Sequence, residues 1–467
     1  MKGNDIVKKK LSIMISAVLV GAFMTACAQT PAPTAPTQET PSAQTPNAET
    51  SSGVPEAIAN GTPVELRVAW WGNDARAEAM EAAIDIFTDR YPSVTVNIEH
   101  GVWGGGAWTE NMITQLAGGV EADIMQVNYA WIHSFGRGQN VFLDLNTVSD
   151  YIDLSEWTAD ELNFMTTGGE LAAVPHGMNG RVMIYNHQML EEFGLDSFPT
   201  TIEELVAYGE LVAANNNAVD DGSNRYAFLP IGPETLDIVI LTMLYNHTGR
   251  TMQENGQMLH TVEEVQYVFD QLGWLQDTNT IPTFHQMDPI QNESNPTWTA
   301  GNGGAAFEWV SNIFVVGSTF GGGDRLDDLG IAPLPSFGGT QATMQRPSLG
   351  HAISRNTNHP EVAAYLLNFL YTDEDALMAI GSTLGIPFPR TASEVAEREG
   401  IIAGHQALGL EILETGTMGV MDPLFEDAAL RQPRFAIIEA FRSESIDSAT
   451  AAQRFINEQQ AALNMLN

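Results

Sequence analysis

Aromatic side chains gather in the segments that follow three predicted strands. Alternating apolar residues predict strands near residues 64–68, 94–98 and 122–127. The segments after them hold Trp70, Trp71, Trp103, Trp108, Tyr129 and Trp131. A flat aromatic ring stacks on the C–H face of a sugar, and neighbouring Asn and Asp side chains exchange hydrogen bonds with the sugar hydroxyls. The pattern favours carbohydrate binding, although any one of these tryptophans can equally be a packing residue.

The sequence lacks the motifs of most catalytic and metal-binding sites. The ten histidines are isolated, without a His-x-His or His-Glu-x-x-His pair, and no Gly-x-Ser-x-Gly or Gly-x-x-x-x-Gly-Lys motif occurs. Cys27 is the only cysteine, so no disulfide can form within the chain. A glycosidase pair among the many carboxylates stays open, but nothing singles one out. We expect no catalytic residue, no metal site and no cofactor.

The predicted elements place the aromatic segments at one edge of a sheet. Apolar residues recur at helical spacing between residues 80 and 87 and again between residues 112 and 116. The order strand, helix, strand, helix, strand implies parallel pairing with right-handed crossovers, and thus an α/β fold. Ligands of such sheets bind outside the carboxyl ends of the strands, which is where the aromatic residues follow.

The charge of the chain excludes several classes of partner. The 467 residues contain 20 Lys+Arg against 58 Asp+Glu, which gives a net charge of −38. All four lysines lie in the first ten residues, so every later cation is an arginine. A field of this sign repels phosphate backbones and favours a soluble monomer, so we expect no nucleic-acid partner. The length and the 44% hydrophobic content suffice for two domains.

The first sixty residues indicate where the protein is located rather than how it folds. Lys8 to Lys10 precede an apolar run over residues 11–26, which is too short for a membrane-spanning helix and is typical of a secretory signal. Cys27 follows Met24-Thr25-Ala26, which resembles the lipobox of bacterial lipoproteins. That resemblance implies a signal peptide over residues 1–26 and acylation of Cys27. Residues 27–62, rich in Pro and Thr, are predicted to be a disordered tether.

Loose motifs along the rest of the chain occur in the order found in one bacterial family. They are Trp70-Trp71-Gly72 with Arg76, Tyr91-Pro92, Ala122–Gln126, Gly168–Pro175, Phe198–Leu205, Ala300–Trp309, Ile331–Pro335 and Leu384–Pro387. Over about residues 63–390 the sequence thereby resembles extracellular solute-binding proteins of family 1, the carbohydrate type, which serve bacterial ABC importers and are similar to maltose-binding protein.

The resemblance implies a periplasmic-binding-protein fold of type II. Each of its two lobes is a sheet flanked by helices, and three crossing segments at 168–175, 331–335 and 384–387 connect them. We expect residues 63–175 plus 336–380 in lobe 1 and residues 180–333 plus 387–467 in lobe 2. Lobes joined in this way close on a ligand.

The resemblance also implies the ligand and the partners. We expect a mono- or oligosaccharide held between the lobes, no catalysis, delivery to ABC permease subunits, and a lipid anchor on the extracytoplasmic face of the cell membrane. Arg76 either makes a forked contact to the ligand or lies on the helix surface near Glu78 and Glu81. Alternatives are the same fold binding a polyamine, metal or anion, or a surface polysaccharide-degrading enzyme. The predicted ligand contacts are Trp71, Asn73, Arg76, Trp103, Asn128, Trp131, Asn179, Trp309 and Asn312.

Overall fold

The computed structural model describes residues 53–101, 107–136, 141–219, 224–232, 234–323 and 325–466. The predicted signal peptide, Cys27, the predicted tether up to residue 52 and Trp103 lie outside these residues. The prediction that the tether extends to residue 62 is wrong. Residues 53–62 are ordered, because the Gly53 amide donates to Asp150 O and Ala57 and Ile58 pack against the apolar core of the first sheet.

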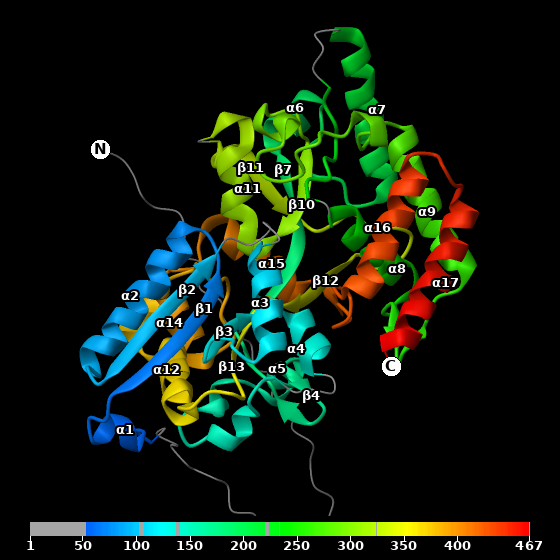
Figure 1. The fold of residues 1–467 in the computed structure, drawn as a ribbon. Coiled ribbons are helices and arrows are strands. Elements are labelled where there is room, and N and C mark those ends of the chain that lie inside the picture. The colour runs from blue at the N-terminus through cyan, green and yellow to red at the C-terminus, as the bar shows by residue number, and fades with distance from the viewer. Residues whose placement is uncertain are drawn as a thin grey trace, which may run out of the picture. The chain divides into compact units, whose positions relative to one another are not determined.

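A mixed sheet organises the first part of the chain (Figure 1). Its strand order is β2-β1-β3-β13-β6. β1 is parallel to β2 and β3, which confirms the predicted alternation of strands and helices, and β13 is antiparallel to β3 and β6. The strands are β1 (Val64–Trp71), β2 (Val94–Gly101), β3 (Ile124–Val127), β6 (Val174–Pro175) and β13 (Gly350–Ile353).

Helices cover this first sheet and close its apolar core. In α2 (Asp74–Arg90) the buried residues Met80, Ala83, Ile84 and Phe87 follow helical spacing, so one face of the helix packs on the core. The other helices of this part are α1 (Glu56–Ala59), α3 (Ala107–Gly118), α4 (Tyr129–Gly136), α5 (Ala159–Phe164), α12 (Pro360–Thr372), α13 (Glu374–Ile380) and α14 (Arg390–Arg398), and a hairpin pairs β4 (Thr166–Thr167) with β5 (Glu170–Leu171).

A second sheet has its own apolar core, which includes Met183, Phe269 and Phe455. The strand order is β10-β7-β12-β14, with β11 also paired to β7. The strands are β7 (Met178–Asn186), β10 (Ala305–Trp309), β11 (Leu329–Ala332), β12 (Ala342–Pro347) and β14 (Thr417–Val420). Around them lie α6 (His187–Glu192), α7 (Ile202–Val219), α8 (Thr235–Thr248), α9 (Val262–Asp277), α10 (Pro296–Thr299), α11 (Ile313–Thr319), α15 (Gly404–Thr415), α16 (Ala428–Arg442) and α17 (Ser448–Leu466), and the hairpin β8 (Gln253–Glu254) with β9 (Gln257–Met258).

Two chain segments pass directly from one sheet to the other, and a third lies against them. Residues 175–178 lead from β6 to β7, and residues 347–350 lead from β12 to β13. Ser348 N donates to Gly177 O at 2.7 Å, and Phe388 N donates to His176 O at 2.6 Å. A Cβ atom at Gly177 would lie 1.6 Å from Ile386 O, so glycine is required where the third segment, residues 381–388, touches the first. Residues 381–388 join α13 to α14 beside the first sheet, so this third segment borders the two crossings and is not itself one. We call the three stretches together the crossing segments.

The structure corrects two predicted crossings and two boundaries. Residues 384–387 are not a crossing, because they join α13 to α14, and both helices lie beside the first sheet. Residues 331–335 are not a crossing, because β11 (Leu329–Ala332) pairs with β7 inside the second sheet. Residues 342–347, predicted in lobe 1, form β12 and hydrogen-bond to β7 and β14 of the second sheet. Residues 390–398, predicted in lobe 2, form α14, whose Ala392 and Val395 pack on Leu377 of α13 beside the first sheet.

Candidate functional site

Trp71 and Trp131 meet where two parallel strands of the first sheet end. Trp71 is the last residue of β1, and Trp131 lies in the first turn of α4, shortly after β3. Their ring centroids are 5.6 Å apart at an interplanar angle of 57°. The relative exposures of Trp71 and Trp131 are 7% and 8%. Together with Tyr129, which begins α4, they form what we call the Trp71 surface.

The polar residues predicted beside these tryptophans hold the local backbone in place. Asn73 is the N-cap of α2 and accepts from Arg76 N, and the buried Asn128 accepts from Ala130 N at the start of α4. Both therefore satisfy amides that a helix start leaves without partners.

Arg76 does not follow the second of its two predicted arrangements, and its contact to a ligand stays a prediction. Its Nε donates to Thr383 O at 2.9 Å and its Nη1 donates to Trp71 O at 3.1 Å. Burial lowers the pKa of the guanidinium to about 10. The guanidinium is thus not a surface group beside Glu78 and Glu81, and two of its nitrogen atoms contact main-chain carbonyls.

Four side chains share one face of the second sheet. Trp309 on β10 pairs with Arg181 on β7, and Arg346 on β12 pairs with Asn179 on β7. Paired residues project to the same side, and residues 179 and 181 are two apart on one strand, so all four side chains lie on a common face. We call Asn179, Arg181, Trp309 and Arg346 the Trp309 surface.

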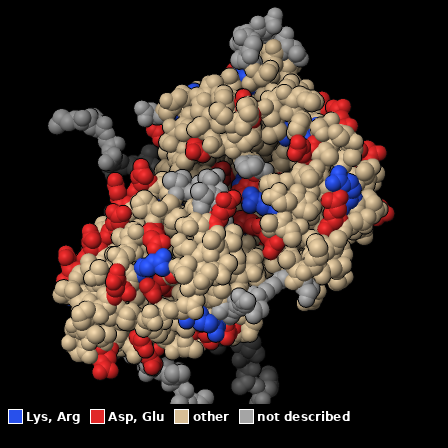
Figure 2. Space-filling view, viewed as in Figure 1, with Lys and Arg blue, Asp and Glu red and all other residues tan. Residues whose placement is uncertain are grey.

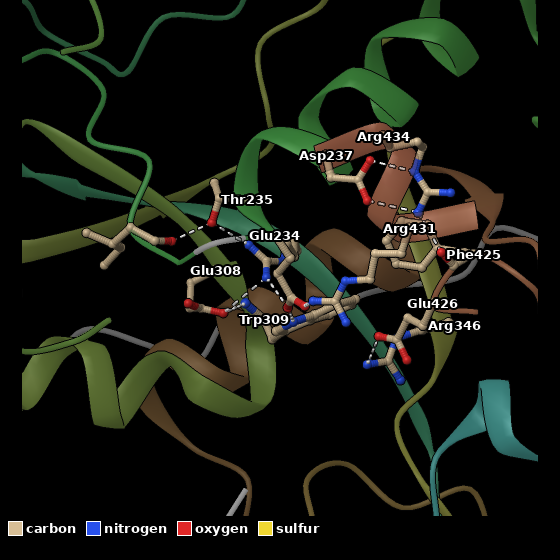
Figure 3. Close-up of polar contacts among 12 residues, drawn as sticks. Glu234, Thr235, Asp237, Glu308, Trp309, Arg346, Phe425, Glu426, Arg431 and Arg434 are labelled. Carbon is tan, nitrogen blue, oxygen red and sulfur yellow. Dashed lines mark hydrogen bonds and ion pairs between the residues drawn. The ribbon is translucent and has the colours of Figure 1, made fainter. Parts of the chain in front are cut away.

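The indole of Trp309 lies among charged groups (Figure 3). The guanidinium carbons of Arg181 and Arg346 are 4.9 and 4.6 Å from its ring centroid, within the range of cation–π attraction. Its Nε1 donates to Glu234 Oε1 at 3.2 Å. Any sugar that stacks on Trp309 must therefore share the ring with an arginine.

Glu234 is the carboxylate on which this surface converges. It accepts from Arg181 Nη2 at 2.7 Å, from Arg431 Nη2 at 2.9 Å and from the Trp309 indole. Burial acts to raise the pKa of Glu234, but the charges of Arg181 and Arg431 outweigh burial and hold the pKa below its usual range.

Glu308 lies 3.9 Å from Arg181 and behaves differently. Burial raises the pKa of its carboxyl, which Arg181 only partly offsets. Glu308 Oε1 also accepts from the amide of Trp309 at 2.8 Å, and Asn312 hydrogen-bonds to the same carboxyl. The predicted contact Asn312 is therefore already engaged by this carboxyl.

Two further polar pairs flank the Trp309 surface. Asn179 Nδ2 donates to Ser311 Oγ at 2.7 Å, so the amide of this predicted contact also has an internal partner. Arg346 Nη2 lies 3.2 Å from Glu426 Oε1. The arginines visible in Figure 2 likewise lie beside acidic side chains, while many acids stand alone on that face.

The two surfaces approach one another through α4. Ser134 Oγ in α4 donates to Asp427 Oδ2 at 3.0 Å, and Asp427 is the N-cap of α16. Burial raises the pKa of Tyr129, and the charges of Asp422 and Arg346 also act on this hydroxyl. Residues from the first-sheet and second-sheet parts are thus within electrostatic reach of each other here.

Sequence reasoning missed most of the charged members of the site. Arg181, Glu234, Arg346, Glu426 and Arg431 were not among the predicted contacts. The scarcity of cations was the usable signal, since 16 arginines are the only basic residues after Lys10. The convergence of Arg181 and Arg346 on Trp309 depends on strand register, which the sequence alone does not give.

The described part of the chain offers neither a cluster of metal ligands nor a candidate membrane span. No group of three or more His, Cys, Asp or Glu side chains there is placed to hold a metal ion. Likewise, none of the helices described is both long and apolar enough to span a bilayer.

Known proteins share this architecture over most of their length. A curated relative, the arabinooligosaccharide-binding protein of Halalkalibacterium halodurans, is 21% identical over 335 residues, which are 69% of this chain and 71% of that protein. The crystal structure of a periplasmic solute-binding protein from Pectobacterium atrosepticum superposes with a TM-score of 0.77 at 24% identity, over 86% of this chain and 99% of that one.

A second solved structure is similar to the same extent. A periplasmic oligogalacturonide-binding protein from Yersinia enterocolitica, in complex with saturated digalacturonic acid, matches with a TM-score of 0.76 at 22% identity, over 86% of this chain and 99% of that one. These likenesses confirm the predicted two-lobed periplasmic-binding-protein fold, and the model of the family described as bacterial extracellular solute-binding protein matches residues 71–377. The chain therefore belongs to the bacterial extracellular solute-binding protein family.

Proposed function

We propose that this protein captures a sugar or oligosaccharide between its two lobes and delivers it to an ABC transporter. The observation that carries the proposal is the pair of tryptophans at the carboxyl ends of β1 and β3, together with a third tryptophan on the second sheet. Indole faces with adjacent hydrogen-bonding groups are the chemistry that holds sugar rings. The relatives named for arabinooligosaccharide and oligogalacturonide support the same ligand class.

In this proposal each lobe supplies half of the contacts. Trp71 and Trp131 face the ligand from lobe 1, and Trp103 is kept as a proposed contact from its place in the sequence. Trp309, Asn179 and Asn312 face it from lobe 2, with Arg346 and Glu426 as hydrogen-bonding groups. Asn73, Asn128 and Arg76 act by holding the loops that carry the tryptophans. Closure of the lobes then removes the sugar from water.

We further propose that the sugar is uncharged. The arginines of lobe 2 near Trp309 already have carboxylate partners: Arg181 and Arg431 pair with Glu234, and Arg346 with Glu426. Asp422 and Asp427 add negative charge at the approach to α4. A uronate would therefore meet guanidiniums that already bind carboxylates, in a region where these two glutamates and the two aspartates outnumber the three arginines, whereas hydroxyls can exchange bonds with both partners of each pair.

The location of the protein in the cell is part of the same proposal. Cys27 carries a lipid that anchors the protein at the extracytoplasmic face of the membrane, the segment after it acts as a tether, and the permease subunits of an importer are the protein partner. The protein works as a monomer without a cofactor and without catalysis.

A thermal unfolding panel tests the ligand class. Arabino-oligosaccharides should raise the unfolding midpoint as their concentration passes Kd, by mass action, and galacturonides of equal length should do so weakly or not at all. Stabilisation by polyamines or metal salts alone would refute a sugar ligand. Release of reducing ends from the oligosaccharides would instead identify a polysaccharide-degrading enzyme.

A further inference from the structure

Each aromatic surface is connected to the crossing segments by one arginine. On the first sheet, Arg76 bridges Trp71 O and Thr383 O, and Thr383 belongs to the third crossing segment. On the second sheet, Arg346 lies against the ring of Trp309, and its Nη1 donates to Pro347 O at 2.9 Å and to Ser348 O at 3.2 Å. Pro347 and Ser348 belong to the second crossing segment.

The crossing segments reached by the two arginines are bonded to a common stretch of chain. Ser348 N donates to Gly177 O, which joins the second segment to the first. Phe388 N donates to His176 O, which joins the third segment to the first. A shift of Arg346 therefore acts on the carbonyls of Pro347 and Ser348, next to the bond between Ser348 N and Gly177 O. A shift of Arg76 acts on the carbonyl of Thr383, in the segment whose Phe388 N is bonded to His176 O.

The guanidinium group suits this role and an ammonium group does not. Arg346 contacts two carbonyls, Glu426 and an aromatic ring at once, which requires the flat fork of arginine with its several fixed donors. Gly72 completes the arrangement on the other side, because a Cβ there would lie 2.5 Å from Cδ of Arg76. The side chain of Arg76 thus packs closely against the backbone at Gly72, which favours the observed conformation of Arg76.

We propose that Arg76 and Arg346 are positioning residues that couple ligand contact at Trp71 and Trp309 to the chain crossings between the lobes, Arg346 directly and Arg76 through the third segment that is bonded to His176. A sugar that contacts either indole shifts the adjoining guanidinium, and this shift moves the carbonyls of the crossing segments to which the guanidinium is bonded. The inference rests on the proposed function for the identity of the ligand, but the hinge contacts themselves can be tested without a sugar.

The first arm of the test uses hydrogen exchange of the full-length protein without ligand. Arg346→Gln removes the fork and should speed exchange of the Ser348 and Phe388 amides at least tenfold. Arg454→Gln is the matched control, because Arg454 pairs with Glu458 one turn along α17, and it should exchange like the wild type. Wild-type exchange at both hinge amides in Arg346→Gln would overturn the proposal.

The second arm adds an arabino-oligosaccharide and measures both heat of binding and exchange. Arg346→Gln and Arg76→Gln should bind at least tenfold more weakly and, at saturation, should leave residues 347–350 and 381–388 less protected than in the wild type. Full hinge protection at saturation would show ligand contacts only and would overturn the coupling. If Arg346→Gln does not fold, Arg346→Lys and Arg76→Gln carry the test.

Failure of the proposed function gives a different result. A wild-type protein that binds no oligosaccharide refutes the sugar assignment, while ligand-free exchange of Arg346→Gln and of Arg76→Gln still decides whether the two arginines hold the crossing segments.

Discussion

The Trp71 surface and the Trp309 surface present the same kind of ring in opposite surroundings. Trp71 packs against another indole and a helix start, and its nearest cation contacts main-chain carbonyls. Trp309 lies against two guanidiniums and donates to a carboxylate. The first surface is held by packing and helix caps, and the second by a network of charge. We infer that the first supplies stacking area and the second supplies orientation.

The largest effect is expected where the charge network is fully buried. Arg434 and Asp237 form a two-pronged pair at 2.7 and 2.9 Å, and neither side chain is exposed. Arg434→Met leaves Asp237 as an uncompensated buried charge, so the free energy of unfolding should fall by about 3–5 kcal/mol. Urea unfolding measures this loss.

The matched control for that loss removes both charges. The double variant Arg434→Met, Asp237→Leu should recover most of the stability, because no lone charge remains. An Arg434→Met protein as stable as the wild type would show that the second lobe does not depend on its buried charges.

Mild acid should weaken the first-sheet part in particular. Burial lowers the pKa of His176 to about 3, helped by His351 and Arg76, and burial lowers the pKa of His351 to about 3 as well. The unfolded chain takes up these protons near pH 6.5 and the folded protein does not. Stability should therefore fall as the pH drops below about 6.5, by about 1.4 kcal/mol per pH unit for each histidine.

The window between pH 6.5 and 5 isolates the histidines, because most carboxylates are still ionised there. His260, whose pKa burial lowers to about 4, contributes in the same direction from the second-sheet part. Urea unfolding at pH 7 and pH 5 measures the slope. The variant His351→Gln should flatten it, and an unchanged slope would argue against a role for this buried histidine in acid sensitivity.

The smallest expected changes in the free energy of unfolding are those of two variants, at the neighbouring carboxylates Glu234 and Glu308. Glu234 accepts from three donors, so Glu234→Gln should lower the free energy of unfolding by about 1.5–3 kcal/mol. Burial raises the pKa of Glu308, and its nearest guanidinium nitrogen is 3.9 Å away, so Glu308→Gln should lower the free energy of unfolding by less than Glu234→Gln does. Equal losses for the two variants would mean that the network does not converge on Glu234.

The first half of the fold was accessible from sequence because its signals are local. Alternation at residues 64–68 and helical spacing at residues 80–87 each report a single element, and the order of elements implies parallel pairing. The strand that continues this sheet, β13, comes from about 220 residues further along the chain, and no local pattern assigns it to β3 rather than to β12. The predicted lobe assignments of residues 342–347 and 390–398 were wrong for this reason.

The site divides in the same way. Trp71 and Trp131 could be named because they follow predicted strands, and their ring contact agrees with that placement. Asn73 and Asn128 were named for their hydrogen-bonding groups, yet their neighbours in sequence are helix starts that need a cap. Arg346 could not be found, because its place beside Trp309 follows from the register of β12 on β7 and of β7 on β10.

The central claim is that both surfaces belong to one sugar site. Calorimetric titration of an arabino-oligosaccharide into the wild type, Trp71→Ala and Trp309→Ala tests it directly. The account predicts one sugar per protein molecule for the wild type and a loss of affinity of at least tenfold in each variant, with both variants still folded by circular dichroism. Wild-type affinity in either variant would contradict it, because one of the two surfaces would then lie outside the site.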